Sequence, residues 1–212
     1  MSARMKSSVT VIGHGAAAVA PDIMRITVSV EVRRPDVTSA FERAGHAAQA
    51  VSEALRASGV SPTDVSTTGL SVHADTVWQE NKGQKLVGYI ATTALSVTLR
   101  DLSAPGRVIA DCVSAGGDDV RLGGLELAIA DQSGLLSQAR DAAFADARAK
   151  AEQYARLSGR ELGKVVEVSE NTEPSAVPRP MVRAMKAAAD AMPIERGETE
   201  LSASVLVRWT LS

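Results

Sequence analysis

Aromatic residues are scarce in this chain of 212 residues and make up only 3% of it. The core must therefore come from aliphatic side chains and alanine, within a hydrophobic fraction of 45% that is ordinary for a globular protein. Proteins that hold single-stranded nucleic acid usually combine aromatic platforms with a basic groove. The net charge of −2 supplies no basic field, so we expect no nucleic-acid partner.

Cysteine and long apolar runs are also nearly absent. Cys112 is the single cysteine, which excludes an intrachain disulfide, and its apolar neighbours favour a small buried side chain over a reactive thiol. No apolar run reaches the roughly 18–20 residues of a membrane span, so no transmembrane segment is expected. Arg4 and Lys6 are not followed by the apolar region of a signal peptide. The sequence as written predicts a cytoplasmic protein, or a periplasmic or cell-envelope protein if a leader has been removed.

The sequence contains no motif typical of a metal site, a phosphate-binding loop or a catalytic nucleophile. His14, His46 and His73 are far apart and have no ligand spacing typical of a metal site. The stretch 13–15, Gly-His-Gly, lies within a predicted strand and precedes no helix, so it is not a phosphate loop. No serine stands in a Gly-x-Ser-x-Gly turn. We therefore predict no catalytic residues, no metal, no cofactor and no enzymatic activity.

Alternation of apolar and polar residues predicts several half-buried antiparallel strands. It is strict over residues 23–33 and again over 201–211. The opening strand, residues 9–15, carries two glycines that indicate an irregularity. The apolar parity changes at Gly123-Gly124, which predicts a β-bulge there. Asn81-Lys82-Gly83 is a hairpin signal between two further strands.

Three helices are expected between these strands. The first follows Pro35-Asp36, with Ser39 and Glu42 as a capping box and Gly59 at its end. The second covers residues 101–115. The third covers 134–158, where an alanine-rich face allows close packing on a sheet. The alanines of that face are Ala139, Ala142, Ala143, Ala147 and Ala151.

The predicted fold class is α+β, with a mainly antiparallel sheet and helices on one face. The element order is ββαββαβαββ, and residues 23–130 have the order of a ferredoxin-like split βαβ unit. No low-complexity linker interrupts the chain before residue 173. We therefore expect one domain spanning residues 1–212, in which residues 174–195 form a Pro/Met-rich irregular segment or a short amphipathic helix.

Local motifs spread over nearly the whole chain resemble those of the SIMPL-domain family, also called domain of unknown function 541. The matching segments are Val11-Ile12-Gly13-His14-Gly15, Pro21-Asp22, Asp64-Val65-Ser66-Thr67, Leu70-Ser71-Val72, Gly88-Tyr89-Ile90-Ala91, the helix from Ala139 to Ala151, and Leu162-Gly163. The resemblance implies a bacterial, envelope-associated protein similar to the 26 kDa periplasmic immunogenic protein group. It further implies assembly into large oligomers, a link to stress, and no established catalytic residues.

Two features are candidates for interaction. Threonine and serine line the outward faces of several predicted strands, open either to solvent or to another subunit. The second is the Met-rich segment, where methionine side chains suit adaptable contacts. Three readings stay open for it: a loop over the protein's own core, an oligomer or partner contact, or a metal or membrane contact. Its candidate contact residues are Met181, Val182, Arg183, Met185 and Met192.

These observations favour a non-enzymatic protein that forms a homo-oligomer through sheet edges and the Met-rich segment, with an interaction, stress-related or envelope-related role. An unknown protein partner is a further expectation. The alternative is a small-molecule carrier, with a pocket between helices and sheet lined by Ala142, Ala143 and Ala147. An unrecognised hydrolase is the third hypothesis.

Overall fold

The computed structural model describes residues 7–80, 82–170 and 194–212. They form two compact units with separate hydrophobic cores. One unit, here called the ferredoxin-like unit, holds the elements from β2 to β5. The other, the α3 unit, combines the first strand with α3 and the last two strands. The assignment of residues 1–212 to a single domain stays a prediction.

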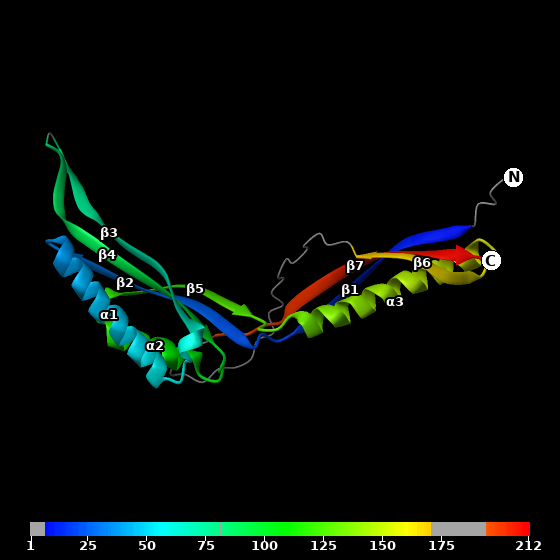
Figure 1. The fold of residues 1–212 in the computed structure, drawn as a ribbon, viewed down its shortest axis with the longest axis horizontal. Helices are drawn as coiled ribbons and strands as arrows, with labels where there is room; N and C mark the ends of the chain where they lie inside the picture. Colours follow the sequence, from blue (N-terminus) through cyan, green and yellow to red (C-terminus); the bar gives the residue numbers. More distant parts are fainter. Residues whose placement is uncertain (1–6, 81, 171–193) are drawn as a thin grey trace. The chain divides into compact units, whose positions relative to one another are not determined.

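The ferredoxin-like unit has a four-stranded antiparallel sheet in the order β3-β4-β2-β5 (Figure 1). Strand β4, the hairpin partner of β3, lies between β3 and β2, which is the arrangement of a split βαβ unit. Its elements are β2 (Ile23–Arg34), α1 (Val37–Ala57), the 3-10 helix η1 (Pro62–Asp64), β3 (Val65–Gln79), β4 (Gly83–Leu99), α2 (Pro105–Gly116), the 3-10 helix η2 (Gly117–Asp119) and β5 (Val120–Ala128).

The core of this unit is aliphatic, as the low aromatic content requires. Alternate residues of β2, among them Val28, Val30 and Val32, are almost fully buried beneath α1 and α2. The other face of β2 carries polar residues that remain half-buried or exposed. The helices therefore cover one face of the sheet, as predicted from the alternation.

Helix α1 begins earlier than the predicted capping box implies. Asp36 is the N-cap, and its carboxylate accepts hydrogen bonds from the Ser39 amide (2.9 Å) and the Ser39 hydroxyl (2.6 Å). Ser39 is therefore the third helical residue instead of the cap, and the capping box with Glu42 is wrong. Aspartate and serine both suit an N-cap, so the sequence alone allows either position.

The bulge predicted at Gly123-Gly124 is confirmed. Arg25 pairs with Glu126 and Thr27 with Gly123, so two residues of β5 stand opposite one residue of β2. Gly124 has φ +61°, a left-handed conformation that glycine adopts readily. Leu122 pairs with Val28 and Leu127 with Met24, so the extra residue places both leucines on the same face of the sheet despite the change in parity.

The α3 unit has a three-stranded antiparallel sheet in the order β1-β7-β6, with one helix on it (Figure 1). Valines and Trp209 from the strands meet the alanines of the helix in its core. Ala142, included in the predicted alanine face, points to solvent instead. The elements are β1 (Ser8–Val19), α3 (Ser133–Leu157), β6 (Leu162–Glu170) and β7 (Thr199–Leu211).

The glycines of β1 serve a close contact with α3. The register between β1 and β7 is regular over all twelve residues, so the predicted irregularity at residues 13–15 is wrong. A Cβ built on Gly13 would overlap the Ala143 carbonyl oxygen and lie 2.6 Å from the Ala147 Cβ, and one on Gly15 would overlap the Ala139 carbonyl oxygen. Glycine facing alanine allows the helix backbone to lie directly on the strand.

The α+β class and the order ββαββαβαββ are confirmed. The strands are distributed over two antiparallel sheets, one in each unit. None of the helices in the described ranges is long and apolar enough to cross a membrane.

Candidate functional site

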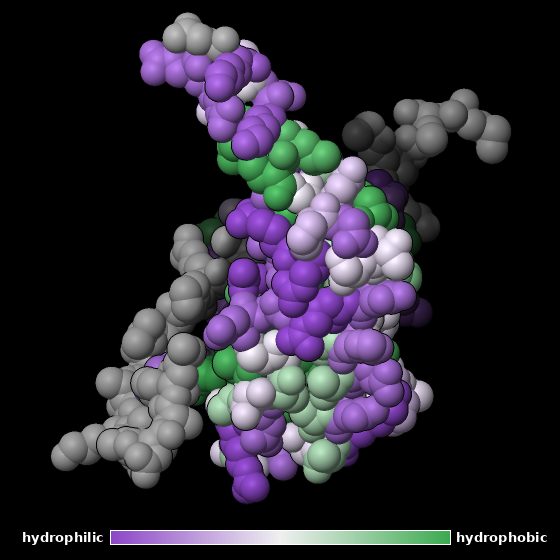
Figure 2. Space-filling view, turned by 90° about the vertical axis from the view of Figure 1, so that its left-hand side faces the viewer, coloured by the Kyte–Doolittle hydropathy of each residue, from purple (hydrophilic) through white to green (hydrophobic). Residues whose placement is uncertain are grey.

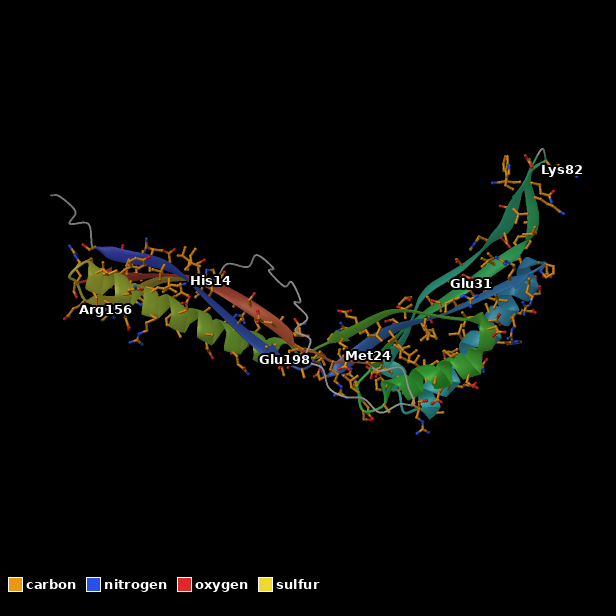
Figure 3. All side chains as sticks on the ribbon, turned by 180° about the vertical axis from the view of Figure 1, so that it is seen from behind. His14, Met24, Glu31, Lys82, Arg156 and Glu198 are labelled. Carbon is orange, nitrogen blue, oxygen red and sulfur yellow. The ribbon has the colours of Figure 1, made fainter. Side chains whose placement is uncertain are left out.

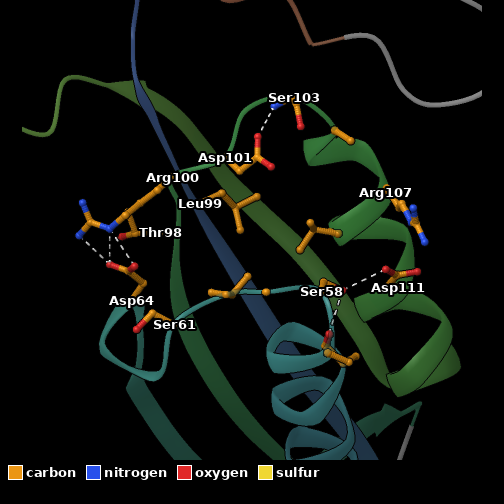
Figure 4. A pocket seen from close by; sticks show the side chains of 16 residues that line it. Ser58, Ser61, Asp64, Thr98, Leu99, Arg100, Asp101, Ser103, Arg107 and Asp111 are labelled. Carbon is orange, nitrogen blue, oxygen red and sulfur yellow. Dashed lines mark hydrogen bonds and ion pairs between the residues drawn. The ribbon is translucent and has the colours of Figure 1, made fainter.

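A cavity of about 860 Å³ opens at one end of the ferredoxin-like unit (Figure 4). The end of α1, η1, the end of β4 and the start of α2 surround it. Its volume is within the range of known small-molecule sites, roughly 300–1,000 Å³. The lining residues are Ala54, Ala57, Ser58, Gly59, Val60, Ser61, Asp64, Thr98, Leu99, Arg100, Asp101, Ser103, Ala104, Arg107, Val108 and Asp111.

An ion pair closes one side of the cavity. Arg100, just after β4, donates to both carboxylate oxygens of Asp64 in η1, with Nε–Oδ2 and Nη2–Oδ1 distances of 2.8 Å. The side chain of Asp64 is only 9% exposed. The hydrogen bonds from Arg100 hold the pKa of Asp64 below its ordinary value and raise that of Arg100. The pair therefore fixes the turn at η1 to the end of the sheet.

The two helices are joined on the opposite side. Ser58, the C-cap of α1, donates to the Ala54 carbonyl (2.9 Å) and contacts Asp111 of α2 at 3.0 Å. Asp101 accepts the Ser103 amide at 2.8 Å, and hydrogen bonding to Ser103 lowers the pKa of Asp101. The carboxylates of the lining are thus engaged with protein groups.

The rest of the lining includes apolar side chains and one arginine. Leu99, Val60 and Val108 supply apolar walls together with small alanines. Arg107 lines the cavity and makes no side-chain hydrogen bond or ion pair with the described residues. Histidine and cysteine are both absent from this lining, so its serine hydroxyls have no imidazole beside them. The contact of a serine hydroxyl with a carboxylate in the lining is that of Ser58 with Asp111, in which the hydroxyl also donates to the Ala54 carbonyl. This geometry can accommodate a small molecule.

The histidines do not converge. His14 is exposed on β1 of the α3 unit (Figure 3), whereas His46 lies on α1 and His73 on the face of the other sheet that α1 does not cover. No group of three metal-ligating side chains was found among the described residues. Cys112 is fully buried in α2, and burial followed by the charge of Asp111 raises its pKa to about 11. It is a packing residue, as predicted.

The predicted interaction residues have different outcomes. Met181, Val182, Arg183, Met185 and Met192 lie outside the described residues. The carrier pocket was predicted in the wrong place, because Ala143 and Ala147 are fully buried against β1 and Ala142 is exposed. The cavity is lined instead by residues of two loops, 58–64 and 100–104. Their serine, proline and aspartate content is a local signal for loops but not for a cavity.

A second candidate surface was missed altogether. Beyond the pair Arg34–Tyr89, β2 ends and the β3–β4 hairpin continues as a two-stranded extension. We call residues 75–79 and 83–88 the arm. Arg33 of β2 anchors its base through an ion pair with Asp75, with an Nε–Oδ2 distance of 2.6 Å.

Large apolar side chains are exposed along the arm. Trp78 is 76% exposed and Leu86 50%. Cross-strand pairing places these two on one face, while Val77, which pairs with Lys85, lies on the other. The end of the arm, where Lys82 lies, is hydrophilic (Figures 2 and 3), with a band of hydrophobic residues just below it (Figure 2).

Comparisons with known proteins agree with the motifs in the sequence. The profile of the SIMPL family, described as a protein family of unknown function (DUF541), matches residues 9–209. The chain is 31% identical over 209 residues to the 26 kDa periplasmic immunogenic protein of Brucella melitensis, covering 94% of this chain and 82% of the relative. It is 30% identical over 185 residues to the uncharacterized protein YggE of Escherichia coli, covering 87% of this chain and 73% of the relative. The chain therefore belongs to the SIMPL family.

Proposed function

We propose that this SIMPL-family protein is a non-enzymatic protein that assembles with copies of itself through the arm. The observation that carries the proposal is the exposure of Trp78, Leu86 and Val77 on a two-stranded extension. Burial of a large apolar side chain contributes about 1.5–3 kcal/mol, so a few such residues supply much of the free energy of a protein contact. Tryptophan is also enriched among the residues that dominate interfaces.

The distribution of polarity on the arm favours a protein partner over a lipid surface. A hairpin that dips into lipid needs apolar residues at its end, whereas Glu80, Lys82 and Gln84 surround the turn here. The apolar band lies behind this polar end (Figure 2), and the strand register places its members on both faces of the hairpin. A partner that encloses the band on two sides while leaving the end in water fits this pattern. We infer that this partner is a second copy of the chain, because a second copy is present wherever the protein is made.

Location in the periplasm or cell envelope is part of the proposal. Its support is the similarity, over most of both chains, to the Brucella relative, which is named as a periplasmic protein. Fractionation of cells that express the natural gene with a C-terminal tag would test it. Recovery of the protein in the cytoplasmic fraction alone would contradict this location. The stress-related role stays a prediction.

Sedimentation velocity over a range of concentrations tests the assembly. The unmodified chain is expected to form species larger than one chain, and the Trp78→Ser/Leu86→Ser variant is expected to sediment as one chain. Leu157→Ser is the matched control, because Leu157 on α3 is 75% exposed and lies outside the arm. An unmodified chain that stays monomeric at every concentration, or an arm variant that assembles like the control, would refute the proposal.

The cavity favours a second candidate function, the carrying of a small molecule. The supporting observations are its volume, its apolar walls and Arg107, whose side chain has no partner in the described part of the chain. Native mass spectrometry of freshly purified protein should then show a bound molecule. Ala57→Trp, which would fill the cavity from α1, should remove that molecule, whereas Ala115→Trp on the exposed part of α2 should retain it. Protein that carries no extra mass in any preparation would count against a carrier.

A further inference from the structure

Strand β1 is an edge strand with an unusually regular backbone. It pairs only with β7, from Ser8–Thr210 to Val19–Thr199, without any register shift. The three other edge strands in the described sheets, β3, β5 and β6, all contain shifts in register. Bulges of that kind protect an edge against pairing with a foreign strand. The edge of β1 lacks this protection.

Charged residues, another common protection of edges, are also lacking in β1. Residues 8–19 contain no Lys, Arg, Asp or Glu, whereas β6 carries Lys164, Glu167 and Glu170. A regular strand of uncharged residues with alternate N–H and C=O groups facing outward is a ready template for strand addition. Something else must therefore occupy this edge if the protein is to avoid such pairing.

Side chains of α3 occupy the outer edge of β1. The carboxylate of Asp146 accepts the His14 amide N–H at 2.8 Å. The ammonium group of Lys150 donates to the Ile12 carbonyl at 3.1 Å and to Asp146 at 2.6 Å. An added strand would need the same amide and the same carbonyl. The ion pair thus stands where the backbone of that strand would lie.

The packing of α3 explains why these two side chains reach the edge. Gly13 and Gly15 bring the helix backbone into contact with β1, so that residues one turn apart on its flank extend past the strand. Asp146 and Lys150 are spaced i, i+4, and each retains between a third and two fifths of its side-chain exposure. The hydrogen bond with Lys150, and then that with the His14 amide, lower the pKa of Asp146, so it is charged at neutral pH.

We propose that Asp146 and Lys150 act as a guard that keeps the edge of β1 from pairing with a strand of a second copy of this chain. This role is separate from the assembly proposed through the arm, which uses another strand pair in the other unit. The guard would restrict association to the intended surface. Its removal should open a second mode of association, by backbone pairing along β1.

The test replaces both guard residues in the full chain. Asp146→Ala/Lys150→Ala keeps helix-favouring residues in α3. The matched control is Arg148→Ala/Glu152→Ala, which removes the other i, i+4 ion pair of the same helix (2.9 Å). Each double variant is also made in the Trp78→Ser/Leu86→Ser background, so that association through the arm does not contribute. In both backgrounds, sedimentation velocity should show a concentration-dependent doubling of mass for the guard variant beyond its control.

Hydrogen exchange identifies the surface involved. In dilute solution the His14 amide of the guard variant should exchange on the order of ten-fold faster than in the control, because it has lost its acceptor. At high concentration that protection should return as strands pair. Adding His14→Pro, which removes the outward donor from an edge strand, should abolish the new association.

Several outcomes would overturn the guard. Guard and control variants that sediment alike at every concentration would do so, as would association that persists with His14→Pro. If circular dichroism shows the double variant to be unfolded, Lys150→Ala alone, which frees the Ile12 carbonyl and retains Asp146, is compared with Arg148→Ala. Equal sedimentation of that pair would equally refute the role. If the unmodified chain does not assemble through the arm, that result contradicts the proposed assembly and leaves the guard role to the comparison of variants.

Discussion

At the scale of single residues, two glycines have opposite surroundings. Gly13 in β1 lies against the backbone of α3, whereas Gly45 in α1 has nothing near its Cβ position. Gly13→Ala should lower the free energy of unfolding by about 3 kcal/mol, because the added methyl meets backbone that cannot yield. Gly45→Ala should raise it by about 0.5–1 kcal/mol through helix propensity. Urea titrations of both variants check this, and shifts of the same sign would contradict it.

The two glycines also show how far the sequence predicts residue roles. Glycine in a strand indicates either an irregularity or a close approach, and the sequence of β1 alone cannot decide between them. The deciding partners, Ala143 and Ala147, are some 130 residues away in the chain. The roles of Cys112 and the buried valines were accessible because local alternation and composition set them.

Cys112 gives a second prediction at this scale. Its full burial and its pKa of about 11 leave almost no thiolate at pH 8, and the thiolate is the reactive form. Ellman's reagent should therefore label native protein very slowly, and labelling should become fast in urea that unfolds the chain. Rapid stoichiometric labelling of the native protein would show that the thiol is accessible.

At the scale of elements, the Asp64–Arg100 pair links η1 to the end of β4. The pKa of Asp64 is lowered from 3.8 in the folded state, so its stabilising effect is full above that pH and is lost as the pH falls through the folded pKa. Asp64→Asn should reduce stability at neutral pH and weaken the acid dependence below about pH 4. Urea midpoints at several pH values measure this. Asp118→Asn is the control, because Asp118 is exposed and its carboxylate makes no hydrogen bond or ion pair with the described residues, while its backbone carbonyl accepts from Arg121 in either variant. An equal effect there would contradict the role.

Element order was predictable because each strand and helix carries its own periodicity. The pairing of β3 with β4 as a hairpin and the bulge in β5 followed from turn residues and parity. The cavity could not be predicted in this way, since it arises where loops from separate parts of the ferredoxin-like unit meet. The exposed arm was missed because the alternation of β3 and β4 continues past the end of β2. Pro35-Asp36 marks the end of β2, but the sequence of β4 does not show at which residue its pairing with β2 ends.

At the scale of the whole molecule, two separate cores bear on the single-domain prediction. Val51 of α1 and Val207 of β7 are both fully buried, one in each core. Val51→Ala and Val207→Ala should each cost about 2 kcal/mol. If the chain is one cooperative domain, both variants should shift one common unfolding transition, followed by circular dichroism and Trp fluorescence. Two transitions, each moved by only one variant, would instead indicate two domains.

The pairing of β1 with β7 sets the order in which the chain can be completed during synthesis. Ser8 lies opposite Thr210, so β1 leaves the ribosome long before β7, the strand with which it pairs. The strands and helices from Ile23 to Ala128 are contiguous and can form meanwhile. A nascent chain stalled before Thr199 would hold β1 without its neighbour, and that interval is when a chaperone would find an uncharged apolar strand to bind.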